Sequence, residues 1–168
     1  MKKLKEIVGY ALGGLMFVLL IPTLMWWVSG KPGLDFEVVP VVRVVFSLCM
    51  ALLGLSLSIW SIVYMRRKGD GNPMDVFGHE VAPRTKHLMT DGPYRLSRNP
   101  MLTGSFIYFA GVCVLLWRWP ALLVFVGFIA IMMFQVFSEE KRLRKDFGEE
   151  YEEYCKRTGR FWPVSLRN

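Results

Sequence analysis

Two polar stretches carry the residue types in this 168-residue chain that are able to do chemistry. The first, residues 91–104, reads DGPYRLSRNPMLTG and places Arg95 and Arg98 just before an apolar run. Arginine binds carboxylate and phosphate groups through its fork of N–H donors. The second stretch begins at Glu139 and Glu140, directly after another apolar run. Adjacent carboxylates suit the binding of a cation or the acceptance of a proton.

The first stretch is expected to be a shaped loop that turns into a helix at Pro100. Proline suits the first turn of a helix, since the N–H group that it lacks has no helical partner there. Asn99 suits the capping position before that turn. Arg98 is thereby predicted to lie where a polar loop meets an apolar helix.

Other candidate residues give weaker signals. His79 and His87 lie eight residues apart without cysteine partners, so no metal site is expected, and either a general base or a solvated loop histidine remains open. Gly69 and Gly71 allow a backbone to approach a ligand closely, and they equally allow a plain turn. The spacing of the three cysteines predicts neither disulfides nor a metal site: Cys49, Cys113 and Cys155.

Four apolar runs must position the two polar stretches. Hydrophobic residues make up 53% of the chain, and the four runs are residues 7–28, 44–65, 101–117 and 121–137. A helix needs ~20 apolar residues to cross a bilayer, so each run is read as a membrane span. Only three residues separate the last two runs, which predicts an antiparallel helical hairpin. Such a hairpin returns the chain to one membrane face and brings the two polar stretches together.

The basic residues predict the orientation of these spans. Of 21 Lys and Arg residues, all but Lys31, Arg43 and Arg118 lie before the first run, in the central loop at residues 66–100, or after the last run. The positive-inside rule then places both termini and the central loop in the cytoplasm. The net charge of +7 is thus a topology signal, and no motif supports nucleic-acid binding.

The segment after the last run is expected to be an amphipathic cytoplasmic helix over residues 138–157, bent at Gly148. One face carries apolar residues at helical spacing: Leu143, Phe147, Tyr151 and Tyr154. Glu140 and Arg144 are read as a surface pair on this helix. The predicted fold class is an all-α integral membrane bundle of four transmembrane helices with this helix at its C-terminus, in a single membrane domain over residues 1–168.

The ordered series GPYRLSRNPMLTG, a hairpin, and EEKRLRKDFGEEYEEYCKRTGRFWP resembles the membrane methyltransferases that act on isoprenylcysteine carboxylates and on phospholipid amines. The resemblance covers residues 66–163. It implies S-adenosylmethionine as the cofactor, bound at the cytoplasmic face of a small helical bundle. It also implies a membrane lipid or a lipid-like acceptor, no metal and no nucleic acid.

The resemblance also implies site residues. Arg98, Asn99 and Pro100 match the Arg-(His/Asn)-Pro signature of the superfamily, and Asn99 is closer to the phospholipid branch than to the isoprenylcysteine branch. Leu102 departs from the tyrosine usual at its position. The acidic pair of the phospholipid branch matches Glu139 and Glu140. Its Gly-x-Gly matches Gly69 and Gly71, and its C-terminal pattern includes Phe147, Gly148, Tyr151, Tyr154 and Pro163.

The residue types suit this chemistry. Glu139 and Glu140 can hold the cationic end of the cofactor, while Arg98 or the backbone amides near Pro100 and Gly104 can hold its carboxylate. Tyr94 and Tyr151 can pack against the adenine or the methionine chain, or act as interface anchors. Glu139 can act as a base for an amine acceptor, whereas Arg98 or Arg142 suits a carboxylate acceptor. The acceptor and the oligomeric state stay open.

Two other readings compete with this one. A membrane reductase of sterol-reductase-like architecture would use NADPH, whose extra phosphate calls for a larger basic cluster than this chain shows. A small membrane protein without enzymatic activity would explain the spans and the charge asymmetry. It would not explain the compact junction over residues 92–104, nor the acidic residues that match it.

Overall fold

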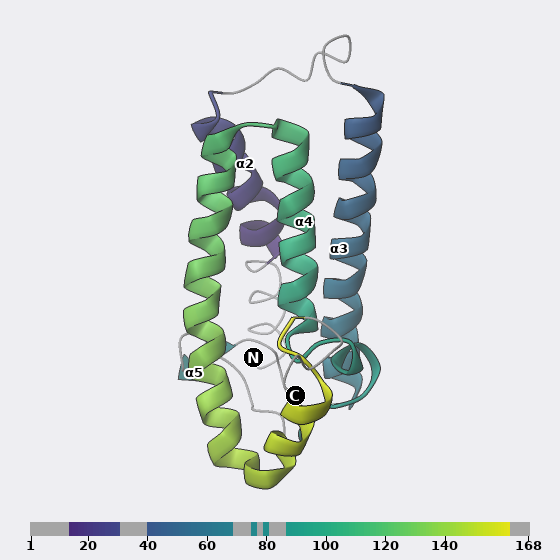
Figure 1. Cartoon of the computed structure of the whole chain (residues 1–168), viewed down its shortest axis with the longest axis vertical. Coiled ribbons are helices and arrows are strands. Elements are labelled where there is room, and N and C mark those ends of the chain that lie inside the picture. Colours follow the sequence, from purple (N-terminus) through teal and green to yellow (C-terminus); the bar gives the residue numbers. More distant parts are fainter. Residues whose placement is uncertain (1–13, 31–39, 69–74, 77–78, 81–86, 162–168) are drawn as a thin grey trace, which may run out of the picture. The chain divides into compact units, whose positions relative to one another are not determined.

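The computed structural model describes residues 14–30, 40–68, 75–76, 79–80 and 87–161, and these are almost entirely helical. The helices in chain order are the π-helix η1 (Leu15–Leu20), α2 (Ile21–Val28), α3 (Val41–Lys68), the 3-10 turn η2 (Gly92–Arg95), α4 (Pro100–Leu116) and α5 (Trp119–Arg157) (Figure 1). Two-residue strands, β1 (Asp75–Val76) and β2 (His79–Glu80), pair antiparallel between α3 and η2. The all-α prediction is confirmed.

Two of the helices, α3 and α5, are long and apolar enough to cross a membrane. Only 17% of the most apolar window of each is buried, whereas a core helix of a soluble protein is mostly buried. Large apolar side chains stay exposed along both, including Leu52, Leu53 and Ile59 on α3 and Leu123, Ile131 and Phe134 on α5. α4 and the helical run Leu15–Val28 are apolar but shorter. Residues 7–13 of the first predicted span lie outside the described residues.

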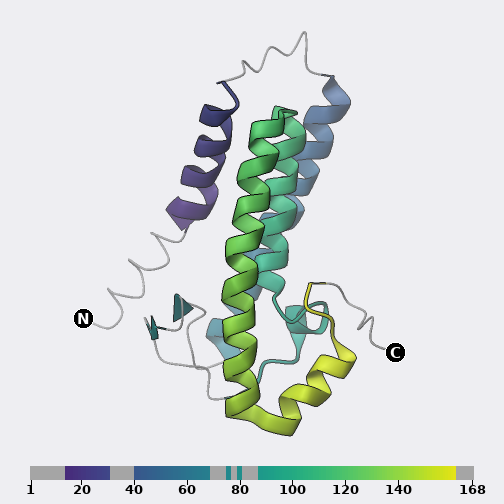
Figure 2. The ribbon, with the colours of Figure 1, turned by 60° about the vertical axis from the view of Figure 1, so that its left-hand side comes forward.

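Helix α5 departs from the predicted division into a span and a separate helix. It continues without a loop from its apolar part into its charged part, and the break comes only at Gly148. Gly148 has φ 52° and ψ −122°, a conformation that the Cβ of other residues disfavours. The predicted bend at Gly148 is therefore confirmed. In Figure 2 the yellow end of α5 turns sharply away from its green part.

The chain divides into two compact units. Unit 1 comprises residues 1–54 and 105–130, and its core is aromatic. Phe109 is fully buried, and its ring centroid lies 4.8 Å from that of Phe128. At Gly111, α4 approaches α3 so closely that a Cβ would lie 3.0 Å from the backbone oxygen of Ser47 and from the Cβ of Met50.

Unit 2 comprises residues 55–104 and 131–168, and its core is built from three tyrosines. Tyr94, Tyr151 and Tyr154 are each less than 10% exposed, and the Tyr154 hydroxyl donates to the backbone oxygen of Tyr94 over 2.6 Å. This bond joins η2 to the last turns of α5. The Ser58 hydroxyl donates to the backbone oxygen of Met101 over 2.9 Å, which joins α3 to the start of α4. In unit 2, these contacts thus join η2 to the last turns of α5 and α3 to the start of α4.

Candidate active site

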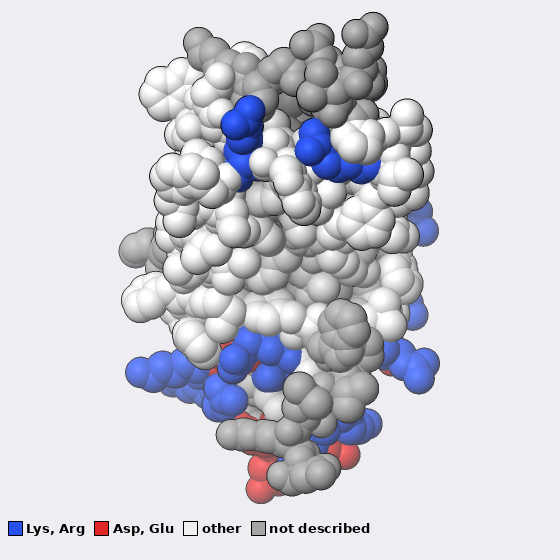
Figure 3. Space-filling model, turned by 45° about the horizontal axis from the view of Figure 1, so that its top comes forward, with Lys and Arg blue, Asp and Glu red and all other residues white. Residues whose placement is uncertain are grey.

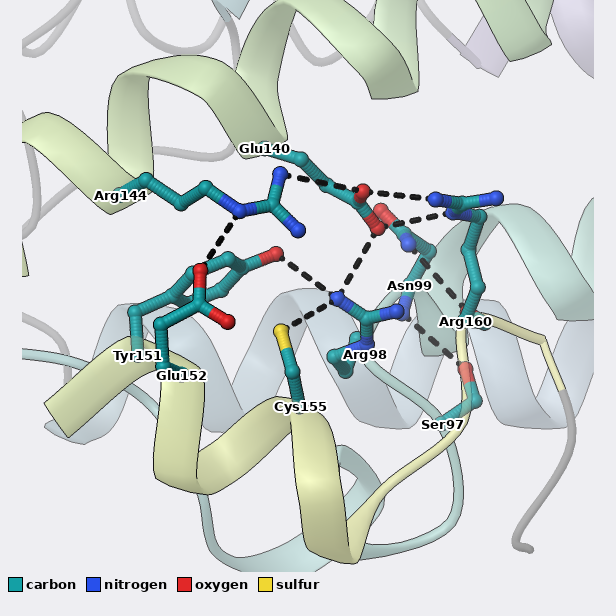
Figure 4. Close-up of polar contacts among 9 residues, drawn as sticks. All are labelled: Ser97, Arg98, Asn99, Glu140, Arg144, Tyr151, Glu152, Cys155 and Arg160. Atoms are coloured by element: carbon teal, nitrogen blue, oxygen red, sulfur yellow. Dashed lines mark hydrogen bonds and ion pairs between the residues drawn. The ribbon is translucent and has the colours of Figure 1, made fainter. Parts of the chain in front are cut away.

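Six side chains of unit 2 form a connected group, which we call the polar cluster (Figure 4). They come from the loop before α4, from α5 on both sides of Gly148, and from the segment after α5: Arg98, Glu140, Arg144, Tyr151, Cys155 and Arg160. The cluster lies where the apolar part of α5 gives way to charged residues. In Figure 3, blue basic and red acidic side chains lie near one another in the lower part of the view.

Glu140 lies at the centre of the polar cluster, with only 4% of its side chain exposed. Arg160 donates to both of its carboxylate oxygens, from Nε to Oε1 and from Nη2 to Oε2, each over 2.8 Å. Nη1 of Arg98 lies 3.1 Å from Oε1, and Nη1 of Arg144 lies 3.8 Å from Oε2. Burial by itself raises the pKa of Glu140, but the Arg160 hydrogen bond and the three positive charges outweigh it and lower the pKa. Glu140 is therefore a buried carboxylate that stays ionised.

Arg98 joins the loop before α4 to the turns of α5 beyond Gly148. Its Nη1 donates to the hydroxyl of Tyr151 over 3.1 Å and to Sγ of Cys155 over 2.7 Å. Within the described part of the chain, its Nε is buried and has no hydrogen-bond partner. A buried N–H of a charged group is costly to leave unpaired. Arg98 thus carries one buried N–H donor whose hydrogen bond is not made within the described residues.

Residues 158–161 form a short segment, which we call the C-terminal strap, that runs against the loop before α4. The backbone N–H of Arg98 donates to the Gly159 oxygen over 2.9 Å. The backbone N–H and the side-chain amide of Asn99 both donate to the Arg160 oxygen, each over 3.2 Å. The guanidinium of Arg160 also lies over the ring of Phe137, 4.8 Å from its centroid. The strap therefore fixes the residues that precede Pro100.

Glu139 has surroundings unlike those of its neighbour Glu140. Its Oε1 lies 3.6 Å from Nη2 of Arg142, and 40% of its side chain is exposed. Burial first, and the charge of Glu140 second, raise the pKa of Glu139. The charge of Glu139 also adds to burial in raising the pKa of the Tyr94 hydroxyl. Glu139 is the acidic residue of the pair that can change its protonation state or meet a cation.

The structure brings some of the predicted site residues together and separates others. Arg98, Glu140 and Tyr151 are in direct contact. Glu139 pairs with Arg142, and Asn99 contacts the C-terminal strap. Tyr94, Pro100, Gly104 and Tyr151 are buried, so neither Tyr94 nor Tyr151 presents an exposed ring face to a ligand. Gly69, Gly71 and Pro163 lie outside the described residues.

Sequence reasoning missed three members of the polar cluster. Arg144 was expected in a surface pair, but its partner Glu140 is buried, and Nε of Arg144 also donates to Glu152 over 2.7 Å. Cys155 and Arg160 were given no role. No periodicity marks them, because the break at Gly148 redirects the chain before either residue is reached. The only signal was that Arg160 lies inside the C-terminal motif, directly after a glycine.

Comparison with known protein families shows the family to which the chain belongs. The model of the phospholipid methyltransferase family matches residues 42–150, which is more than half of the chain. The match covers α3 from its second residue onward, all of α4 and the part of α5 that holds Glu139 and Glu140. Comparison with curated proteins and with solved structures gives no match. The apolar helices agree with a membrane protein, and the chain belongs to the phospholipid methyltransferase family, a family of membrane methyltransferases.

Proposed function

We propose that this protein transfers a methyl group from S-adenosylmethionine to a lipidic or hydrophobic acceptor at the membrane surface. The observation that carries the proposal is the polar cluster, in which Arg98 of the loop before α4 meets Glu140 at the end of the apolar part of α5. Family membership supports methyl transfer as the reaction. The exposed apolar side chains of α3 and α5 support an acceptor that is reached from lipid.

The residues present fit the proposed cofactor. The unpaired Nε of Arg98 suits a carboxylate. The polar cluster has three arginines, which pair with Glu140 inside the cluster and with Glu152 beside it. One positive charge is therefore in excess. Glu139, with its open side, suits a cation. When bound, S-adenosylmethionine supplies a methyl group from its sulfonium, and the sulfur keeps the electron pair of the C–S bond that breaks. Neither a metal nor a covalent enzyme intermediate is therefore required.

The task of the protein is then to hold donor and acceptor in line and to exclude water, which contributes up to ~7–11 kcal/mol in favourable systems. In this proposal Arg98 holds the cofactor carboxylate, and Glu139 holds its cationic end or accepts the proton of an amine. A carboxylate acceptor would instead be held by Arg142. Tyr94 and Tyr151 support the site from the core of unit 2. Asn99, Pro100 and Gly104 shape the start of α4, and Gly69 and Gly71 stay candidates for a close backbone approach.

The proposed topology places this site on the cytoplasmic face. Four spans, in residues 7–28, 44–65, 101–117 and 121–137, would leave both termini and residues 66–100 on the side that carries most of the Lys and Arg. The charged part of α5 after Phe137 would lie on that same side. Labelling of single introduced cysteines by a membrane-impermeant reagent would test each loop.

The test of the proposed function is methyl transfer itself. Purified protein in lipid vesicles would be given S-adenosylmethionine with a labelled methyl group and a total lipid extract, and the lipids would then be separated by head-group class. We expect label in one lipid class with the wild-type protein, and at least a tenfold lower rate with Arg98→Ala or Glu139→Gln. Glu153→Gln, at an exposed residue of α5, is the matched control and should keep the wild-type rate. Binding of NADPH in place of S-adenosylhomocysteine, or label in no fraction, would contradict the proposal.

A further inference from the structure

Arg160 is the residue that ties the separate parts of the polar cluster to one another. Its guanidinium binds both oxygens of Glu140, each over 2.8 Å. Its backbone oxygen accepts two hydrogen bonds from Asn99, the residue before Pro100. Its charge lies over the ring of Phe137, at the apolar end of α5. One residue therefore contacts the loop before α4, the carboxylate of Glu140 and the last aromatic residue of the apolar part of α5.

The contact with Glu140 limits what that carboxylate can do. Its two oxygens already accept from Arg160 and face Arg98 and Arg144, and almost none of the side chain is exposed. A bidentate arginine–carboxylate pair fixes the orientation of both partners, which a single ammonium cannot do. Glu140, held in this way, faces Nη1 of Arg98 at 3.1 Å. Arg160 thus makes the forked contact with Glu140, and Glu140 is one of three groups that contact Nη1 of Arg98, beside Tyr151 and Cys155.

On the basis of the proposed function, we infer that Arg160 is a positioning residue for methyl transfer: its forked contact with Glu140 and its backbone contact with Asn99 hold Arg98 in the orientation that binds the cofactor. Arg160 need not touch the cofactor. The two residues of the acidic pair then have different roles. Glu140 binds the arginines of the polar cluster, whereas Glu139 stays accessible to a ligand.

The test compares three forms of the full-length protein in detergent by calorimetric titration with S-adenosylhomocysteine: wild type, Arg160→Lys and Arg160→Ala. Arg160→Lys keeps the charge but loses the fork, so we expect the dissociation constant to rise at least fivefold. Arg160→Ala should raise it at least twentyfold. Arg157→Gln is the matched control, because Arg157 pairs with Glu153 on the surface at 3.8 Å, and we expect its affinity to lie within twofold of wild type.

Chemical rescue separates positioning from a general loss of structure. The side chain of Arg160 is 32% exposed, so a small cation can reach the space that Arg160→Ala creates. Methylguanidinium should restore the affinity of Arg160→Ala at least fivefold, whereas methylammonium, with the same charge and no fork, should restore less than twofold. Neither cation should change the affinity of the wild-type protein.

Each outcome decides one of the two proposals. Wild-type protein that does not bind S-adenosylhomocysteine overturns the proposed function. If the wild type binds, then wild-type affinity in Arg160→Lys, or equal rescue by the two cations, overturns the positioning role alone. Should Arg160→Ala not fold, Arg160→Lys decides by itself: a fivefold loss of affinity with an unchanged circular dichroism spectrum supports the inference, and an unchanged affinity overturns it.

Discussion

Different kinds of interaction stabilise the interior of each of the two units. Unit 1 is organised by aromatic contacts around Phe109 and by the close approach of helices at Gly111. Unit 2 joins a tyrosine core to a network of charges around Glu140. The ring contact between Phe109 and Phe128 in unit 1 involves no ionisable group, whereas the contacts around Glu140 in unit 2 are between charged groups. We therefore expect that changes in the packing of unit 1 lower stability without lowering cofactor affinity, whereas changes in the polar cluster of unit 2 lower both.

The substitution Glu140→Gln in unit 2 should have the largest effect. The change leaves Arg98, Arg144 and Arg160 around a neutral amide, and removal of one partner of a buried ion pair costs about 3–5 kcal/mol. We expect a large loss of stability together with a loss of cofactor binding. Chemical denaturation and titration with S-adenosylhomocysteine measure the two effects. Unchanged stability would show that the arginines do not depend on Glu140.

Phe109→Ala tests the aromatic packing of unit 1. Phe109 is fully buried among aromatic rings of unit 1, so truncation opens a cavity that costs about 3 kcal/mol. We expect lower thermal stability, with the cofactor affinity of the folded protein within twofold of wild type. Leu123→Ala, at an exposed position on α5, is the control and should leave both quantities unchanged. A loss of affinity in folded Phe109→Ala would mean that the two kinds of contact are coupled.

Gly111→Ala should have a smaller effect of the same kind. Its added methyl group would lie 3.0 Å from the backbone oxygen of Ser47, so α3 and α4 must move apart slightly, at a cost of about 1–2 kcal/mol. Gly127 offers a control on α5, because a Cβ there meets no atom within 4 Å. We expect Gly127→Ala to be neutral or slightly stabilising. Equal melting temperatures for the two variants would argue against the close helix approach.

The smallest predicted effect is a difference in acid response. The pKa of Glu140 is lowered in the folded protein, so its contribution to stability is complete above the pKa of the unfolded chain, about 4.3, and is lost as the pH falls through the folded value. Denaturation of wild-type protein between pH 6 and pH 3 should show this loss. Glu140→Gln, compared over the same range, should show a shallower decline; an identical decline would assign the acid sensitivity to other groups.

The sequence supported a prediction of the contact between the two polar stretches but not of its details. The short turn between residues 117 and 121 required a hairpin, and a hairpin brings Arg98 toward Glu140 whatever the side-chain geometry. Helical spacing likewise placed Tyr151 and Tyr154 on one apolar face, and the structure shows both residues buried. Arg160 and Cys155 could not be placed, because their positions depend on the backbone conformation of Gly148, and local sequence does not specify that direction.

The different environments of Glu139 and Glu140 were also beyond sequence reasoning. Both residues follow the same apolar run, and the family resemblance treats them as a pair. Adjacent residues on a helix point about 100° apart, so only the surrounding arginines decide which carboxylate is enclosed. The side chain of Glu140 is 4% exposed and that of Glu139 is 40% exposed.

The central claim is that the polar cluster of unit 2 and Glu139 beside it bind the cofactor. Calorimetric titration of S-adenosylhomocysteine into purified wild-type protein, Arg98→Ala and Glu139→Gln tests this claim most directly. We predict one binding site in the wild type and at least a tenfold weaker affinity in each variant, while circular dichroism shows that both remain helical. Wild-type affinity in both folded variants would contradict the claim and place the cofactor elsewhere in the chain.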